Sequence, residues 1–187
     1  MIYTIFASVM AYIATNIDDM FINIFLFSTS HSKKDDVAIV LGKYLGTGLL
    51  VAFSCLGAYG AQSFIREYIH FLGIVPVLLG IKEIWSNIKG QAGEDQPSVA
   101  KGFVLSTALI TIANGADNVG VYIPLFASFS TVQLAVMALV FCVMTALWCA
   151  TGKRRTKLPA IATALEKHST VIVPAVYILL GLYILFF

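Results

Sequence analysis

The sequence predicts an all-α polytopic membrane protein, with six transmembrane helices arranged as two inverted three-helix repeats. Hydrophobic residues make up 59% of the 187 residues and charged residues only 12%, whereas soluble domains carry about 25% charged residues. Mean hydropathy is +0.88. Acidic residues nevertheless interrupt the apolar runs at Asp18, Asp19 and Asp117. Because a carboxylate at the bilayer centre costs at least about 2.5 kcal/mol, such residues typically mark an ion or proton pathway.

Six apolar runs are long enough to cross a bilayer, since a transmembrane helix needs about 20 apolar residues. They cover residues 2–27, 37–61, 69–88, 101–129, 132–150 and 170–187. In the second run, Gly42 and Gly46 form a small-residue pair that favours a close helix contact. Lys43 is expected to extend its ammonium group to the cytoplasmic surface of the membrane. The third run carries Lys82 and Glu83 near its end, which leaves five spans as the alternative count.

The distribution of lysine and arginine predicts the orientation, because short loops rich in these residues stay in the cytoplasm. With six spans, the opposite side holds only Arg66, and both termini are expected outside the cytoplasm in a multi-pass protein of the cell membrane. The first run has no basic segment before it, so a cleaved signal peptide is not expected. We interpret the basic residues as signals that set the orientation in the membrane, and they predict no nucleic-acid partner. Those on the cytoplasmic side are Lys33, Lys34, Lys43, Lys82, Lys89, Lys101, Lys153, Arg154, Arg155, Lys157 and Lys167.

The first and fourth runs share a motif. Residues 13–19, IATNIDD, align without a gap on residues 112–118, IANGADN, at an offset of 99 residues. The chain is therefore expected to consist of two repeats, residues 1–90 and 100–187, within a single membrane domain. Because each repeat has an odd number of spans, the second enters the membrane in the opposite direction. This arrangement is typical of secondary transporters, whose site lies at the repeat interface.

Polar residues at helical spacing define a candidate metal site in these motifs. Asn16, Asp19 and Asn23 would share one face of a continuous helix. Gly115, Gly120 and Pro124 accompany the second motif, and helix breakers at this depth are tolerated mainly where freed carbonyls line a cavity or bind an ion. Carboxylate, amide and carbonyl oxygens are ligands for hard divalent cations. The expected metal ligands are Asp18, Asp19, Asp117, Asn16, Asn114, Asn118 and Asn23.

For the single asparagines and for Tyr122, interhelical hydrogen bonding that holds the bundle together is the alternative interpretation. The aspartates favour function more strongly, because adjacent like charges in a low dielectric repel unless a cation or proton intervenes.

Cysteine and histidine give weaker signals. A soft ion such as cadmium favours thiolate ligands, yet the sequence has no Cys-x-x-Cys motif and no Cys-His cluster. We therefore interpret the three cysteines of the chain as small apolar residues that pack in the membrane core. His70, at the start of the third run, and Glu83 are reserve candidates for admitting the metal. The cysteines are Cys55, Cys142 and Cys149.

At the strings TNIDD (residues 15–19) and ANGADN (residues 113–118), the chain resembles the bacterial cadmium resistance transporter (CadD) family of the lysine exporter (LysE) superfamily. The resemblance covers nearly the whole chain. It implies a secondary carrier that exports divalent cadmium from the cytoplasm, with the metal as substrate and no cofactor. The residues alone predict only a divalent cation carrier, because similar acidic motifs in the superfamily serve manganese and calcium carriers. Zinc, and small organic cations or amino acids, are the other substrates left open.

The carboxylates also predict which ion drives transport. An emptied cluster of carboxylates favours proton uptake, so proton antiport is expected. No Walker loop, Ser-His-Asp set or Gly-x-Gly-Asp motif is present, so neither an ATP-driven pump nor an enzyme is expected. The predicted partners are a divalent metal ion, protons and the lipid bilayer. The sequence leaves a homodimer open.

Overall fold

A computed structural model of the chain describes residues 1–17, 19–64, 66–89, 103–155 and 159–186. Within these ranges, the side chains at 64–69, 83, 86–89, 116, 155, 159–170 and 172 are outside the description. The described residues are helical and contain no β-strand. The all-α expectation is therefore confirmed for this part of the chain.

In the first half of the chain, two short helices precede one long one. They are α1 (Ile2–Asn16), α2 (Asp19–Ser28) and α3 (Lys33–Phe64), followed by the 3₁₀ segment η1 (Arg66–Gly73) and by α4 (Ile74–Lys89). The second half repeats this order with α5 (Phe103–Asn114), α6 (Ala116–Ala127), α7 (Thr131–Arg155) and α8 (Pro159–Phe186). In both halves two short helices precede a long one, and the first and fourth predicted spans are each divided into two helices.

The division of these spans changes the number of helices that could cross a membrane singly. Two described stretches, Lys33–Ser63 and Thr131–Arg154, are long and apolar enough, and α1 and α2 qualify together as a pair bent by 62°. The other apolar helices of the described chain are shorter: His70–Lys82, Phe103–Asn114 and Val173–Phe186. Within the described residues, length and composition therefore identify two membrane-spanning helices, or three if the bent pair is one span.

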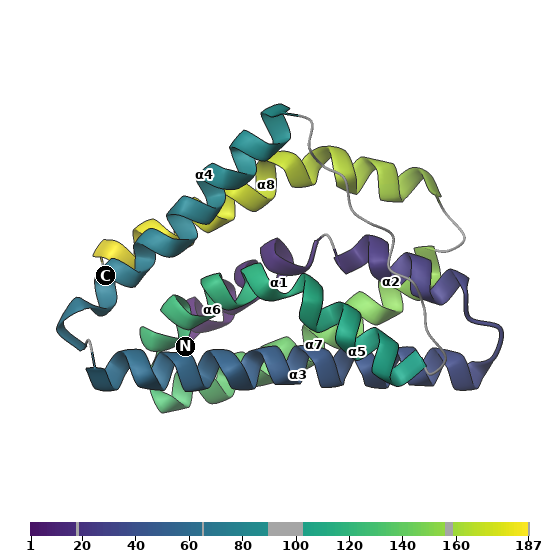
Figure 1. Ribbon diagram of the computed structural model, residues 1–187, viewed down its shortest axis with the longest axis horizontal. Helices are drawn as coiled ribbons and strands as arrows, with labels where there is room; N and C mark the ends of the chain where they lie inside the picture. The colour runs from purple at the N-terminus through teal and green to yellow at the C-terminus, as the bar shows by residue number, and fades with distance from the viewer. Residues whose placement is uncertain (18, 65, 90–102, 156–158, 187) are drawn as a thin grey trace.

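The two halves pack reciprocally. The long helix α3 lies against α5 and α6 of the second half, and the long helix α7 lies against α1 and α2 of the first. Helices α4 and α8 pack against each other along the upper edge of Figure 1. As a consequence, the two divided pairs, α1–α2 and α5–α6, lie between long helices, and α1 contacts α6.

Small residues allow the closest of these contacts. A Cβ atom added to Gly42 would lie 2.7 Å from Cβ of Thr107, and one added to Gly46 would lie 2.7 Å from Cβ of Thr111. The expected close contact of the second span is confirmed, with α5 as its partner. Since α3 and α5 cannot approach this closely with larger residues, these glycines fix the distance between α3 and the second motif.

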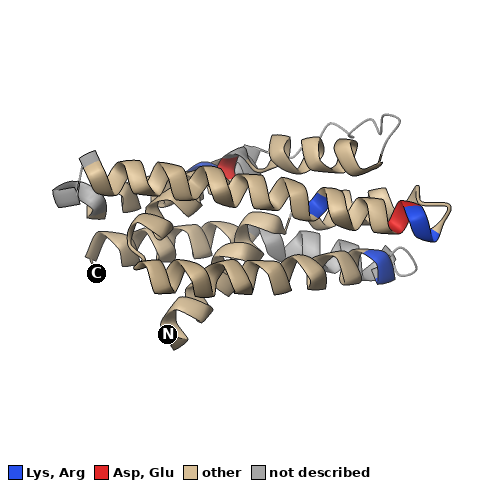
Figure 2. Cartoon of the chain, turned by 90° about the horizontal axis from the view of Figure 1, so that it is seen from below, with Lys and Arg blue, Asp and Glu red and all other residues tan. Residues whose placement is uncertain are grey.

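Apolar side chains cover the outside of the long helices, and charges gather at one end. Leu41, Leu45 and Phe53 of α3 are exposed, as are Leu139 and Val143 of α7, which fits a surface facing lipid. Figure 2 shows Lys, Arg, Asp and Glu mainly at the end where α3 begins and α7 ends. There Lys153 Nζ lies 2.7 Å from Asp36 Oδ2.

Candidate metal site

Both motifs interrupt a helix. Helix α1 ends at Asn16 and α2 begins at Asp19, while α5 ends at Asn114 and α6 begins at Ala116. Under the offset of 99, the break at Gly115 corresponds to Asn16, the last residue of α1, so the two breaks lie at neighbouring positions of the aligned motifs. The expectation of a continuous helix through Asn16, Asp19 and Asn23 is therefore wrong. The two halves of the motif belong to different helices.

The two breaks have different physical causes. Gly115 leaves the helical conformation at φ −89° and ψ 15°, and a Cβ atom there would collide with Leu50 of α3. The first break has no glycine or proline at residues 16–18. It is stabilised by donors from the other half of the chain, since Trp148 Nε1 donates to Asn16 O at 2.6 Å. The carbonyl groups freed at the end of a helix require such partners.

Asp19, in the first turn of α2, forms a buried ion pair. Lys43 Nζ of α3 donates to Asp19 Oδ2 at 2.6 Å, and the two side chains are 1% and 3% exposed. Asn114 Nδ2, at the end of α5, donates to Asp19 Oδ1 at 3.2 Å. Both carboxylate oxygens are thus held by groups from the neighbouring helices, and Asp19 connects α2, α3 and α5.

The expectation that Lys43 extends to the membrane surface is wrong. Ile39, Gly46 and Leu50 share the buried face of α3 with Lys43, and its chain points inward rather than along the helix to the surface. A buried ammonium group is costly unless it is paired. The carboxylate of Asp19 supplies this pairing. Lys43 is the central residue of the site that the sequence interpretation missed, and its one signal was a lysine within an apolar run.

Asn16 belongs to a hydrogen-bonded network between α1 and α6. Its Nδ2 lies 3.0 Å from Tyr12 O, 2.9 Å from Thr15 Oγ1 and 3.1 Å from Tyr122 Oη. The hydroxyls of Thr15 and Tyr122 are 2.7 Å apart. All of these groups are buried. The geometry fits the bundle-stabilising interpretation of Asn16 and Tyr122, because their polar atoms already have protein partners.

Asn118 and Asp117 occupy the first turn of α6. With its amide nitrogen facing the acceptors, Asn118 donates to Thr15 O at 2.9 Å and to Asp117 Oδ1 at 3.2 Å. The backbone N–H of Asn118 also donates to Asp117 Oδ1, at 3.0 Å. Asn118 is buried, whereas Asp117 is exposed. The second motif therefore caps the end of α1 and leaves its carboxylate accessible.

Asn23 differs from the other motif residues. It is fully buried, one turn after Asp19 in α2, and neither amide atom has a hydrogen-bond partner in the described structure. Its Cβ would lie 2.9 Å from a Cβ added to Gly152 of α7. An unpaired buried amide costs about 1–3 kcal/mol. Asn23 thus retains an unused oxygen that a ligand could engage.

The structure describes six of the seven predicted metal ligands. Asp18 lies outside the described residues. The described part of the chain contains no group of three or more His, Cys, Asp and Glu side chains arranged to hold a metal ion. The structure brings Asp19 to Asn114, and Asp117 to Asn118.

The other candidates lie in separate environments. The three cysteines are free, with Cys55 half-buried, Cys142 exposed and Cys149 buried. Cys149 packs in an apolar cluster with Ile22 and Ile39, which each lie within about one turn of Asp19 or Lys43. His70 Nδ1 is 3.2 Å from Ile184 O. The side chain of Glu83 is outside the described residues.

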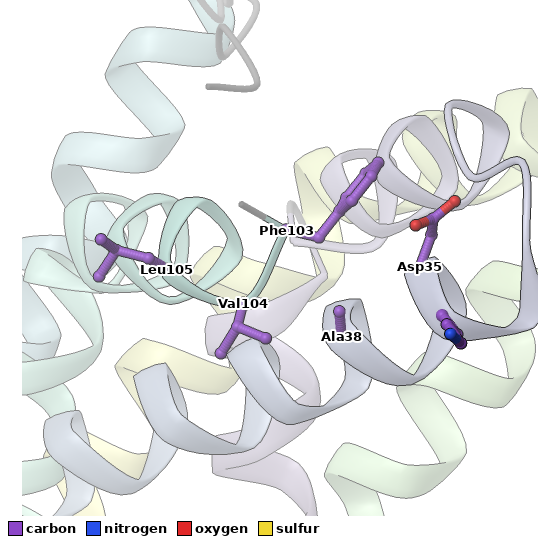
Figure 3. A pocket seen from close by; sticks show the side chains of 6 residues that line it. Asp35, Ala38, Phe103, Val104 and Leu105 are labelled. Carbon is purple, nitrogen blue, oxygen red and sulfur yellow. The ribbon is translucent and has the colours of Figure 1, made fainter. Parts of the chain in front are cut away.

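An open groove lies between the first turns of α3 and α5. Its volume is about 510 Å³, and none of the motif residues lines it. Figure 3 shows Phe103 and Asp35 on either side of Ala38. The groove is therefore distinct from the candidate metal site. The residues that line it are Lys34, Asp35, Ala38, Phe103, Val104 and Leu105.

A family model described as cadmium resistance transporter matches residues 12–187. No curated protein and no solved structure gives a significant match. The family match includes both motifs, both divided helices and the helices packed around them. Since it spans nearly the whole chain, this protein belongs to the cadmium resistance transporter family.

Proposed function

We propose that this protein is a secondary carrier that exports divalent cadmium from the cytoplasm through a site formed where its two divided helices meet. The observation that carries the proposal is that both aligned motifs break a helix and that the next helix has an aspartate in its first turn, Asp19 in α2 and Asp117 in α6. The family supports cadmium as the substrate.

The broken helices provide oxygen ligands and an electrostatic field that favours a bound cation. The C-terminal ends of α1 and α5 carry partial negative charge, and discontinuous helices of secondary transporters use such ends to coordinate cations. Asn23 adds a buried amide oxygen without a partner. The proposed ligand set remains the carboxylates and amides of the two motifs: Asp18, Asp19, Asp117, Asn16, Asn114, Asn118 and Asn23.

The reciprocal packing supports an inverted repeat. Each long helix packs against the divided pair of the opposite half, and α4 packs against its counterpart α8. A two-fold relation between residues 1–90 and 100–187 would produce this pattern. In the six-span arrangement the site lies at the interface of the repeats, and rocking of one repeat against the other would expose it alternately to the two sides.

Export requires an energy source, for which we propose proton antiport. An inside-negative potential opposes cation exit by about 2.3 kcal/mol per charge per 100 mV, so a uniporter could not defend a cell against the metal. When the metal leaves, the remaining carboxylates repel one another and favour proton uptake. Manganese, zinc and calcium are the alternative metal substrates for the same oxygen ligands. A small organic cation or an amino acid is the alternative outside the metals.

Cadmium survival of cells that express defined variants tests the function. We expect the wild type to raise survival and lower cellular cadmium, and Asp19→Asn and Asp117→Asn to remove both effects at equal expression. Asp35→Asn, which changes a carboxylate of the groove outside both motifs, is the control and should behave as wild type. Wild-type tolerance in either motif variant, checked by immunoblot, would eliminate the shared site. Parallel cultures with zinc and manganese salts rank the substrates.

A further inference from the structure

We infer that the Lys43 ammonium group is a tethered competitor of the metal, which occupies Asp19 when the carrier is empty and is displaced when the metal binds. The inference rests on the proposed function and deepens it, because it assigns to Lys43 the control of metal affinity and release. Lys43 is buried at the junction of α2, α3 and α5 and is absent from the set of metal ligands.

The geometry places a cation on the carboxylate already. Lys43 Nζ lies 2.6 Å from Asp19 Oδ2, and both side chains are almost fully buried. Asn114 holds the other oxygen at 3.2 Å. A metal ion that coordinates Oδ2 would lie close to Nζ, and two cations at such a distance in a buried site repel each other strongly. Metal binding at Asp19 is therefore coupled to displacement of Lys43.

The empty carrier needs this cation. A buried carboxylate that loses its only charged partner is strongly destabilised, so an Asp19 without metal or ammonium would resist the conformational change that resets the carrier. Because Lys43 is covalently attached, its effective concentration at Asp19 is high and constant. It can return to Oδ2 as the metal departs, which favours release on the outer side.

Unpaired buried hydroxyls beside Lys43 could receive the displaced ammonium group. Thr47 follows Lys43 by one turn on the buried face of α3, and its Oγ1 has no partner in the described structure. Thr107 Oγ1 is also unpartnered, and Thr107 packs against Gly42, the neighbour of Lys43 in the chain. A hydroxyl accepts hydrogen bonds from an ammonium group. The four-carbon stem of lysine permits such a movement, whereas the planar fork of arginine holds a carboxylate more rigidly.

Equilibrium binding of radioactive cadmium to the purified full chain in detergent, at constant pH, tests the inference. Lys43→Met keeps the length of the side chain and removes the charge, so we expect its Kd to fall by at least about tenfold, within the usual range for coupled sites. Lys43→Arg keeps the charge and should weaken cadmium binding severalfold. Lys34→Gln, at an exposed position of the same helix, should bind as wild type. Adding Asp19→Asn to Lys43→Met should remove the gain in affinity.

Thermal melting of each variant, with and without cadmium, shows which proteins are folded. If folded Lys43→Met binds no tighter than wild type, Lys43 has a structural role only and the inference is wrong. If Lys43→Met does not fold, Lys43→Arg decides, since unchanged or tighter binding contradicts competition and weaker binding supports it. If the wild type binds none of cadmium, zinc or manganese, the proposed function fails together with the inference. If the wild type binds the metal and no Lys43 variant changes its affinity, the inference about Lys43 is wrong but the proposed function stands.

Discussion

At the scale of single residues, the buried asparagines of α1 and α2 differ in whether their amides are already used. Asn16 contacts a backbone carbonyl and two hydroxyls, so its role in holding α1 to α6 is visible in the structure. Asn23 is equally buried but has no hydrogen-bond partner among the described residues. A buried polar group without a hydrogen-bond partner calls for an explanation such as a functional role.

The substitution Asn23→Leu tests whether Asn23 is a metal ligand or only a structural residue. Leucine has a similar volume and no polar atom to satisfy, so we expect the variant to melt a few degrees higher than wild type, since about 1–3 kcal/mol of desolvation cost is relieved. Cadmium binding should weaken, because an oxygen ligand is lost. The measurement is thermal melting together with cadmium binding in detergent. Asn16→Leu is the matched control and should melt lower, because it removes the hydrogen bonds that the amide donates to Tyr122 Oη and Tyr12 O. Unchanged cadmium binding in Asn23→Leu would remove Asn23 from the ligand set.

Residue types and spacing in the sequence identified polar groups but not their partners. The motif asparagines and aspartates were recognised from their place within apolar runs. The partner of Lys43 is 24 residues away, and nothing in the local pattern distinguishes a lysine that reaches outward from one that pairs inward. Likewise, the contact of Asn114 with Asp19 depends on how α5 packs against α2 and α3.

At the scale of elements, the breaks determine where the site is. Gly115 was recognisable from the sequence as a helix breaker, and the structure places the second break there. The first break was missed because its cause is tertiary, since the indole of Trp148 lies 132 residues from Asn16 in the chain. Local propensity alone predicts an uninterrupted helix from 2 to 27.

Gly115→Ala tests whether the second break needs its present geometry. A methyl group at this position would collide with the end of the Leu50 side chain. Because Leu50 is itself buried, we expect α5 and α6 to move away from α3 and Asn114 to lose its place beside Asp19. We expect cadmium efflux to fall at least about tenfold, as misplacement by about 1 Å can cost more than this. Leu50→Ala in the same chain removes the obstacle and should restore part of the efflux. Gly48→Ala, at a site with no atom near the added methyl group, should behave as wild type. Full efflux in Gly115→Ala would show that the geometry of this break is dispensable.

At the scale of the whole molecule, composition and the repeated motif predicted an all-helical membrane protein with two similar halves. The described helices follow this order, and the long helices pack against the divided pairs of the opposite half. Composition could not give the number of uninterrupted spans, because the first break depends on a donor from a distant helix, the indole of Trp148. Many of the described charged residues lie at one end of the molecule (Figure 2).

The orientation of the chain follows from that charge asymmetry. We expect both termini to lie outside the cytoplasm, because lysines and arginines concentrate in the loops after the first, third and fifth predicted spans. A cysteine placed at either end, in a chain whose own cysteines are replaced by serine, should react with an impermeant thiol reagent in intact cells. A cysteine at position 32, in the loop before α3, should stay unlabelled. Labelling of the N-terminal but not the C-terminal site would indicate five spans and contradict the inverted repeat.

Metal flux across proteoliposomes that contain only this chain tests the central claim most directly. With cadmium inside and a pH-sensitive dye in the same vesicles, an imposed proton gradient should accelerate cadmium exit, and cadmium exit should drive protons in the opposite direction. Asp19→Asn and Asp117→Asn vesicles should show neither flux, and Asp35→Asn vesicles should show both. No cadmium movement in wild-type vesicles would contradict the carrier itself. Cadmium movement that does not depend on the proton gradient, and carries no protons, would contradict antiport.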